Sequence, residues 1–249
     1  MTVHLLGTGA ARSDAHRTTT MLAIESGGRL VLVDCGGDAL QRMLACGLDV
    51  ASLDALVVTH EHPDHIAGFP LLIERLWLHE RAAPLPIVGN AAALAQARRS
   101  WEAFDTSGWT GLFAFDWRQL PDGEGALAWE DARLRITASP VVHGPPTLGL
   151  RFEESASGTR RVLAYSCDTE PCDAVVGLAR GADLLVHEAT GAFKGHSSAA
   201  QAAAVAARAG ARRCVLVHLP PGLTDDDLDE ARATFADVRV GVEGEAVAV

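Results

Sequence analysis

Lysine is almost absent from this chain, in which Lys194 is the only lysine among 21 basic residues. The 32 acidic residues outnumber the basic ones, and the formal net charge is −11 at pH 7. A chain of this charge is not expected to offer a large cationic face that holds a polyanion by releasing its counterions. Small or locally bound substrates are therefore favoured, and recognition of anions by side chains falls mainly to arginine.

Cysteine is also scarce, and its pattern is not that of paired residues. The five cysteines are odd in number and form no CxxC pair, which argues against a disulfide framework and a closed thiolate zinc site. The chain contains no run of about 18 uncharged apolar residues, and its first residues carry no basic leader. We therefore expect a cytoplasmic protein without a membrane partner.

Regular structure can be predicted from the spacing of apolar residues. Short β-branched or leucine-rich runs between Gly, Asp and Pro predict strands at residues 3–6, 20–24, 30–33, 55–58, 134–137, 148–152, 161–165, 184–187 and 214–218. Apolar residues three or four positions apart predict helices at residues 38–46, 64–78, 172–179, 198–209 and 225–235.

This order of elements predicts an α/β fold. Two strand-rich halves, about residues 1–120 and 121–249, are separated by a turn at Pro121, Asp122 and Gly123. Such halves bury their apolar faces best as two packed sheets with helices outside. We expect one domain over residues 1–249, folded as a four-layer αββα sandwich.

The segment at residues 60–65, which reads HEHPDH, carries the strongest chemical signal. A predicted buried strand delivers His60 and His62 into a loop, and Asp64 and His65 fall on the first turn of the next helix. Imidazole and carboxylate are the ligands that zinc takes when one coordination position stays open for water. A lone histidine is more often structural, but this density of ligands predicts a catalytic metal site.

Three further candidate ligands also follow apolar runs that are predicted strands. They are His143, Asp168 and His218. Because residues at the ends of neighbouring strands meet at one edge of a sheet, we expect these side chains to complete the site.

The order of these residues resembles the metallo-β-lactamase fold superfamily, with its early Asp, HxHxDH, His, Asp and His, over residues 7–218. The matching positions are Asp34, His60, His62, Asp64, His65, His143, Asp168 and His218. The resemblance implies the αββα fold and two divalent ions, with zinc expected and manganese or iron also suited to the ligands. It places one ion on His60, His62 and His143, and the other on Asp64, His65 and His218. Asp168 would bridge them, Asp34 would orient ligands, and a metal-bridging hydroxide would attack the substrate.

A second resemblance concerns the branch of the superfamily. The segments YSCDT at residues 165–169, HEAT at 187–190 and GHSS at 195–198 resemble ribonuclease Z, which hydrolyses phosphodiesters. It implies that Glu188 and His196 pair near the leaving-group oxygen, and with Asp64 they form the predicted catalytic set. The alternative is structural, with Glu188 capping a loop and His196 merely preceding a helix.

Two departures from ribonuclease Z bear on the substrate. The loop that reads the tRNA end in that family matches residues 13–18 here and keeps only Arg17. The tRNA-grasping arm would lie between His143 and Asp168, where 24 residues suffice for one hairpin. We therefore expect a phosphodiesterase for a small or nucleotide-like ester, without extensive nucleic-acid binding. Arg17 would contact an anionic group or form a surface salt bridge.

Other functions and one aromatic segment stay open at this point. Residues 77–129 hold all five tryptophans, which suits a pocket wall, a homodimer interface or core packing. The same centre could hydrolyse a lactone, thioester or carboxylic ester, since the hydroxide also attacks acyl carbon. A tRNA 3′-processing endonuclease and a non-catalytic binding module are the remaining alternatives.

Overall fold

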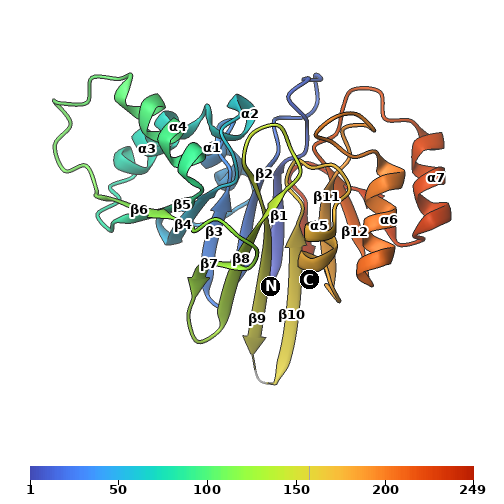
Figure 1. Cartoon of the computed structure of the whole chain (residues 1–249). Helices are drawn as coiled ribbons and strands as arrows, with labels where there is room; N and C mark the ends of the chain where they lie inside the picture. Colours follow the sequence, from blue (N-terminus) through green and yellow to red (C-terminus); the bar gives the residue numbers. More distant parts are fainter. Residues whose placement is uncertain (157) are drawn as a thin grey trace.

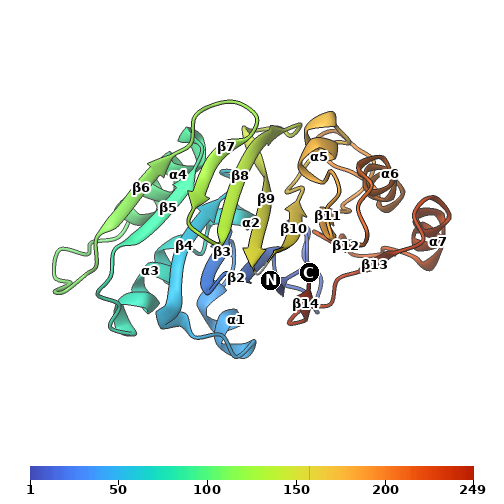
Figure 2. The ribbon, with the colours of Figure 1, turned by 90° about the horizontal axis from the view of Figure 1, so that it is seen from below.

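The computed structural model describes residues 1–156 and 158–249. Its strands form two seven-stranded sheets that face each other, with helices on both outer sides (Figures 1 and 2). The first sheet has the order β14-β1-β2-β3-β4-β5-β6, and the second has the order β13-β12-β11-β10-β9-β8-β7. The expected αββα sandwich is confirmed.

The first sheet and its helices come mainly from the first part of the chain. The strands are β1 (Thr2–Gly7), β2 (Met21–Ser26), β3 (Arg29–Val33), β4 (Leu53–Val58), β5 (Leu85–Gly89), β6 (Phe115–Gln119) and β14 (Ala246–Ala248). The helices are α1 (Ala39–Ala45), the 3-10 turn η1 (Val50–Ser52), α2 (Pro63–Ile66), α3 (Phe69–Leu78) and α4 (Ala91–Glu102).

The second sheet and its helices follow. The strands are β7 (Ala126–Glu130), β8 (Leu134–Val141), β9 (Thr147–Ala156), β10 (Thr159–Tyr165), β11 (Leu184–Glu188), β12 (Cys214–Val217) and β13 (Val238–Val240). The helices are α5 (Asp173–Leu178), α6 (Ala199–Ala209) and α7 (Asp225–Thr234). The antiparallel pair β9 and β10 is the hairpin expected between His143 and Asp168.

Three apolar clusters hold the layers together. The central one lies between the sheets and includes Val31, Phe152 and Tyr165, all buried. A second packs α1–α4 on the first sheet, and an alanine-rich third packs α5–α7 on the other. Because burial of apolar area is the main favourable term in folding, these clusters fix the sheets relative to each other. None of the described helices has the length and apolarity needed to cross a membrane.

The carboxyl ends of the parallel strands gather at one edge of the sandwich. Strands β3, β4 and β5 are parallel in the first sheet, and β10, β11 and β12 are parallel in the second. Their ends lead into the loops beside α2, at the upper edge in Figure 1. Functional side chains in α/β folds occur at such an edge, because loops from several strands converge there.

One predicted helix is divided in the structure. Residues 64–78 were expected to form a continuous helix, but α2 ends at Ile66 and α3 begins at Phe69. A Cβ atom on Gly68 would lie 2.1 Å from the carbonyl oxygen of Gly37. The break therefore occurs where the loop after β3 packs directly against the helical segment.

The aromatic segment at residues 77–129 mostly packs against protein. The rings of Trp77 and Trp109 stack with centroids 4.5 Å apart, and Trp77, Trp101 and Trp117 pack against the cluster under α1–α4. Phe104 is an exception, with 60% of its surface exposed. Core packing therefore accounts for most of this segment.

The close packing beside α2 gives a stability test. A Cβ atom on Gly36 would lie 1.7 Å from the backbone oxygen of Asp64, so Gly36→Ala must push α2 away. We expect a fall in the free energy of unfolding of about 1–3 kcal/mol or more, measured by denaturant titration. Gly177→Ala, in α5 with open space around it, is the control and should be neutral or stabilising by up to about 1 kcal/mol. Equal stability of Gly36→Ala and the parent protein would contradict this packing argument.

Candidate metal centre

The HEHPDH segment folds as a strand end followed by a short helix. Thr59 and His60 follow β4 directly, and His62 is the N-cap residue of α2, whose first residue is Pro63. Proline suits this first helical position because its fixed φ is helical and no backbone N–H is needed there. His60 and His65 are fully buried. The local sequence therefore aims several ligand side chains at one point.

The first group of candidate ligands contains His60, His62, His143 and Asp168. Their ligand atoms all lie within 4.8 Å of one another. His143 Nε2 lies 3.2 Å from His62 Nδ1. Asp168 Oδ2 lies 3.9 Å from both His60 Nε2 and His143 Nε2. These four side chains come from both sheets.

The second group contains Asp64, His65, His218 and again Asp168. His218 Nε2 lies 3.2 Å from Asp64 Oδ2 and 3.4 Å from Asp168 Oδ2. His65 Nε2 lies 3.6 Å and 3.5 Å from the same two oxygens. Asp168 therefore belongs to both groups, in the position expected of a bridging carboxylate.

The donor set fits divalent cations. Ligand atoms about 2.0–2.1 Å from a tetrahedral zinc ion lie about 3.3–3.4 Å from one another, which is close to the separations in both groups. His60 Nε2, His65 Nε2 and Asp168 Oδ1 are buried and make no hydrogen bond with the described residues. A buried polar atom without a partner is costly, and cations held by the two groups would offset that cost.

The protonation states of His60, Asp64 and Asp168 suit metal binding, whereas His65 must lose a proton when a cation binds. Burial lowers the pKa of His65, but Asp168 and Asp34 outweigh burial and raise that pKa well above the usual range. Burial, together with the charge of His65, lowers the pKa of His60 to about 2, so its imidazole is neutral. Burial opposes the ionisation of Asp64, but the hydrogen bond with His218 outweighs it and the pKa is about 2. Asp168 is likewise held ionised, since the charges of His218 and His65 overcome the effect of burial on its pKa. Neutral imidazole and ionised carboxylate are the forms that coordinate metal.

A buried hydrogen-bond network orients the ligands of both groups. Asp34 Oδ2 accepts from His65 Nδ1 at 2.8 Å and from the hydroxyl of Thr59 at 2.8 Å. Because the Thr59 hydroxyl donates to Asp34, it can only accept from His60 Nδ1, 3.1 Å away. With Nδ1 of each ring engaged in this way, Nε2 is the nitrogen that would face a metal ion. Asp34 thus lies where an orienting residue was predicted, and Thr59 was not predicted.

Two further contacts orient His143 and His218. His143 Nδ1 lies 2.7 Å from the backbone oxygen of Gly195. The hydroxyl of Thr190 donates to the His218 backbone oxygen at 2.9 Å and lies 2.6 Å from His218 Nδ1. Sequence reasoning missed both partners, because a backbone carbonyl and a lone threonine have no distinctive pattern.

Glu188 and His196 form a close pair beside the second group. Glu188 Oε1 lies 2.9 Å from His196 Nδ1, and Glu188 is fully buried. Burial lowers the pKa of His196, but the hydrogen bond and charge of Glu188 outweigh it, so the net shift is upward. The His196 ring stacks on that of His218, with centroids 5.7 Å apart. The pair is therefore in contact with the candidate metal ligands.

Glu188 also holds the surrounding backbone. Its carboxylate accepts from the N–H groups of Thr169 at 2.9 Å and Thr190 at 3.0 Å, and from that of Ser197 at 3.3 Å. The loop-capping contact of the structural alternative is thus present together with the His196 contact.

The remaining candidates lie around the centre. Arg17 forms an ion pair with Asp14 at 2.7 Å, the arrangement that its structural alternative describes. Cys167, which was not proposed as a ligand, directs Sγ at the Thr59 hydroxyl, 3.0 Å away. Burial raises the pKa of the Cys167 thiol well above its usual range. It therefore stays protonated and supports Thr59 from behind.

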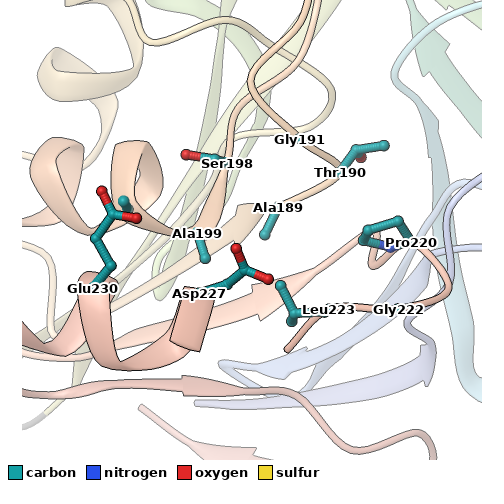
Figure 3. A pocket seen from close by; sticks show the side chains of 11 residues that line it. Ala189, Thr190, Gly191, Ser198, Ala199, Pro220, Gly222, Leu223, Asp227 and Glu230 are labelled. Carbon is teal, nitrogen blue, oxygen red and sulfur yellow. The ribbon is translucent and has the colours of Figure 1, made fainter. Parts of the chain in front are cut away.

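A small pocket lies beside the loop that follows β11 (Figure 3). Its volume is about 120 Å³, and it lies between the N-terminal turn of α6, α7 and the loop after His218. Thr190, which orients His218, forms part of its wall, and the predicted metal ligands do not. The metal centre is thus separate from this pocket.

Comparisons with known proteins agree with this geometry. Residues 29–219 match a beta-lactamase superfamily domain. The ribonuclease Z of Mycobacterium bovis (strain BCG / Pasteur 1173P2) is 33% identical, over 94% of this chain and 91% of that protein. The ribonuclease Z of Methanothermobacter thermautotrophicus is 28% identical, over 94% and 92%.

Solved structures share the whole fold. The metallo-beta-lactamase fold protein YhfI from Bacillus subtilis has a TM-score of 0.79 at 26% identity, covering 99% of this chain and 98% of that one. The human short-form tRNase Z has a TM-score of 0.81 at 24% identity, covering 100% and 99%. At that identity the human structure supports the fold alone.

An αββα sandwich with clustered His and Asp ligands at its strand ends defines a metal-dependent hydrolase. The chain belongs to the metallo-β-lactamase fold superfamily, and its resemblance to ribonuclease Z is confirmed.

The prediction about partners is wrong. A small-molecule ester without extensive nucleic-acid binding was expected, whereas the relatives at 33% identity are ribonucleases. The expectation rested on the whole-chain charge and on the departures at residues 13–18 and between His143 and Asp168, and the similarity over 94% of the chain outweighs them. The value of −11 is a sum over the entire chain, whereas binding of a polyanion depends on the local potential around a site.

The hydrogen bonds of Thr59 can be tested by substitution. Thr59→Val removes the hydroxyl that fixes the His60 tautomer, and we expect zinc affinity to fall about 10–100-fold in a chelator competition assay. Thr59→Ser keeps the hydroxyl and is the matched control, with affinity near that of the parent protein. If both variants bind zinc as tightly as the parent, the hydroxyl has no orienting role.

Proposed function

We propose that this protein is a phosphodiesterase that cleaves RNA with a two-metal centre. The Glu188–His196 pair carries the proposal, because cleaving a P–O bond leaves an alkoxide that needs a proton. The ribonuclease Z relatives support RNA as the substrate class. The ligand geometry supports hydrolysis, since both groups keep buried donor atoms for cations.

The ligands divide between two ions in this proposal. His60, His62 and His143 hold one, Asp64, His65 and His218 hold the other, and Asp168 lies between both groups. Two divalent ions held there would supply a water of lowered pKa as nucleophile and would neutralise charge on the phosphate. We propose zinc for both positions, because imidazole and carboxylate suit it.

His196 is the proposed acid. Its Nδ1 is bonded to Glu188, while Nε2 makes no hydrogen bond with the described residues and is free to face the leaving oxygen. The upward shift of its pKa keeps the ring protonated closer to neutral pH. Glu188 holds the ring in place and stabilises its charge, so the acid keeps a fixed position.

Metal content gives the first test of this proposal. Elemental analysis of the protein should find two divalent ions per chain. The variant His62→Ala should contain fewer, because His62 belongs to the ligands of the first ion. Cleavage of RNA should stop after chelation and return when zinc is added. Full cleavage by chelated protein would contradict a metal mechanism.

The role of His196 as an acid can be tested by comparing substrates whose leaving groups do and do not need a proton. Glu188→Gln and His196→Ala should lower kcat on RNA about 10²–10⁴-fold with metal content retained. On bis(p-nitrophenyl) phosphate the loss should be much smaller, because nitrophenolate leaves without a proton. Equal losses on both substrates would show that the pair does not act as the acid.

The substrate class can be tested with a set of candidate substrates. A 3′-extended precursor tRNA, an unstructured oligoribonucleotide and a set of lactones and aryl esters should be incubated with zinc-loaded protein. Cleavage of either RNA supports the proposal, and the two RNA arms separate tRNA processing from general RNA cleavage. Turnover of lactones or aryl esters alone would overturn it.

A further inference from the structure

The loop between β11 and α6 presents two unusual side chains beside the candidate metal centre. Phe193 has 56% of its surface exposed, and the next residue is the exposed Lys194. Lys194 is also the only lysine of the chain. An aromatic face and a mobile cation thus lie side by side on the loop that carries His196.

This loop is held tightly at its base. The N–H of Gly191 donates to the Ser197 oxygen at 2.9 Å, and that of His196 donates to the Phe193 oxygen at 3.0 Å. The N–H of Gly195 donates to Glu170 Oε1 at 2.8 Å. These bonds hold the backbone of the loop in place, and the Phe193 and Lys194 side chains project from it.

Glycine at position 195 brings the loop close to the metal centre. Its φ is +85°, and a Cβ atom there would lie 3.0 Å from His143 Nδ1. The Gly195 carbonyl accepts from that same ring nitrogen. The loop therefore touches a predicted metal ligand directly, without room for a side chain.

The aromatic ring continues a row of rings that starts at the metal ligands. The centroid of Phe193 lies 5.0 Å from that of His196, which in turn lies 4.9 Å from that of His143. Phe193 is thus one ring away from the proposed acid. A nucleotide whose phosphodiester lies at the proposed acid would therefore have the Phe193 ring within reach of its base.

We propose that Phe193 and Lys194 form a nucleotide-binding subsite, which rests on the proposed cleavage of RNA. The ring of Phe193 stacks on the nucleobase next to the scissile bond, since every base offers a π-face to an aromatic side chain. The ammonium of Lys194 contacts the adjacent phosphate as a point charge. An isolated exposed phenylalanine is ordinary, but here it shares a constrained loop with the proposed acid and the only lysine.

Stacking can be tested with an oligoribonucleotide whose cleavage position is mapped first. Phe193→Ala should raise KM about tenfold to a hundredfold, with kcat and metal content close to the parent values. Phe193→Trp should keep the parent KM. On the same oligonucleotide with an abasic position next to the cleaved bond, parent and Phe193→Ala should differ less than about twofold.

The contact of Lys194 with a phosphate can be tested by the salt dependence of RNA binding. Lys194→Ala should weaken RNA binding and reduce the slope of log affinity against log salt by about one. Lys194→Arg should restore the slope because it restores the charge. Leu78→Ala, which removes an apolar side chain 63% exposed at the end of α3, is the control and should change neither KM nor the salt slope.

The outcomes distinguish this subsite from the proposed function. If the zinc-loaded parent does not cleave RNA, the proposed function fails and the subsite falls with it. If the parent cleaves RNA and Phe193→Ala has the parent KM, the subsite alone is overturned. An equal loss on intact and abasic RNA would also overturn it, because the ring would then support the loop rather than a base.

Discussion

The carboxylate of Asp34 is the contact on which the site most depends. It follows β3 and accepts from the backbone N–H of Thr59 after β4, from the Thr59 hydroxyl and from His65 in α2. One buried side chain therefore ties two parallel strands to the helix that carries ligands. A buried acceptor that loses its donors costs the full desolvation penalty. The ends of β3 and β4 and helix α2 are therefore held in fixed positions relative to one another.

The site stores strain at the same strand ends. Asp34, Cys167 and His218 all have positive φ, at 62°, 53° and 52°, in a region that non-glycine residues avoid. Each costs of order 1–3 kcal/mol. The buried polar atoms without hydrogen-bond partners add to this cost. The packing of the surrounding layers therefore holds these three residues in a backbone conformation that they disfavour. Bound cations would offset part of this cost, so folding and metal binding are coupled.

Much of the fold and site could be predicted because the relevant signals are local. A buried run ending in His60, or in His218, indicates both a strand and a ligand at its end. The break at Gly68 has a local signal that the prediction overlooked, since Pro70 is tolerated only in the first turn of a helix. The contact of Gly68 with a loop some 30 residues earlier in the chain is visible only in the fold. Helix α4 was also missed, although Asn90 as N-cap and an alanine-rich run are a helix signal.

The orienting contacts escaped prediction for a different reason. Thr59 acts through one hydroxyl that touches Asp34, His60 and Cys167 at once, and only the folded chain brings these together. The substrate prediction failed because it gave too much weight to the missing arm and loop and used a sum of charges in place of their positions. Lys194 illustrates the point, since one cation beside the site is invisible in a total of −11.

The two sheets contribute unequal and complementary parts of the centre. The first supplies His60, His62, Asp64 and His65 from one short segment, whose mutual geometry is set locally by β4 and α2. The second supplies His143, Asp168 and His218 from three separate loops. Because each metal group draws on both sheets, the separation of its ligands depends on the packing between them. The apolar cluster around Phe152 and Tyr165 therefore sets the spacing of the candidate ligands as well as the stability. A change of volume there would alter metal affinity without touching any ligand.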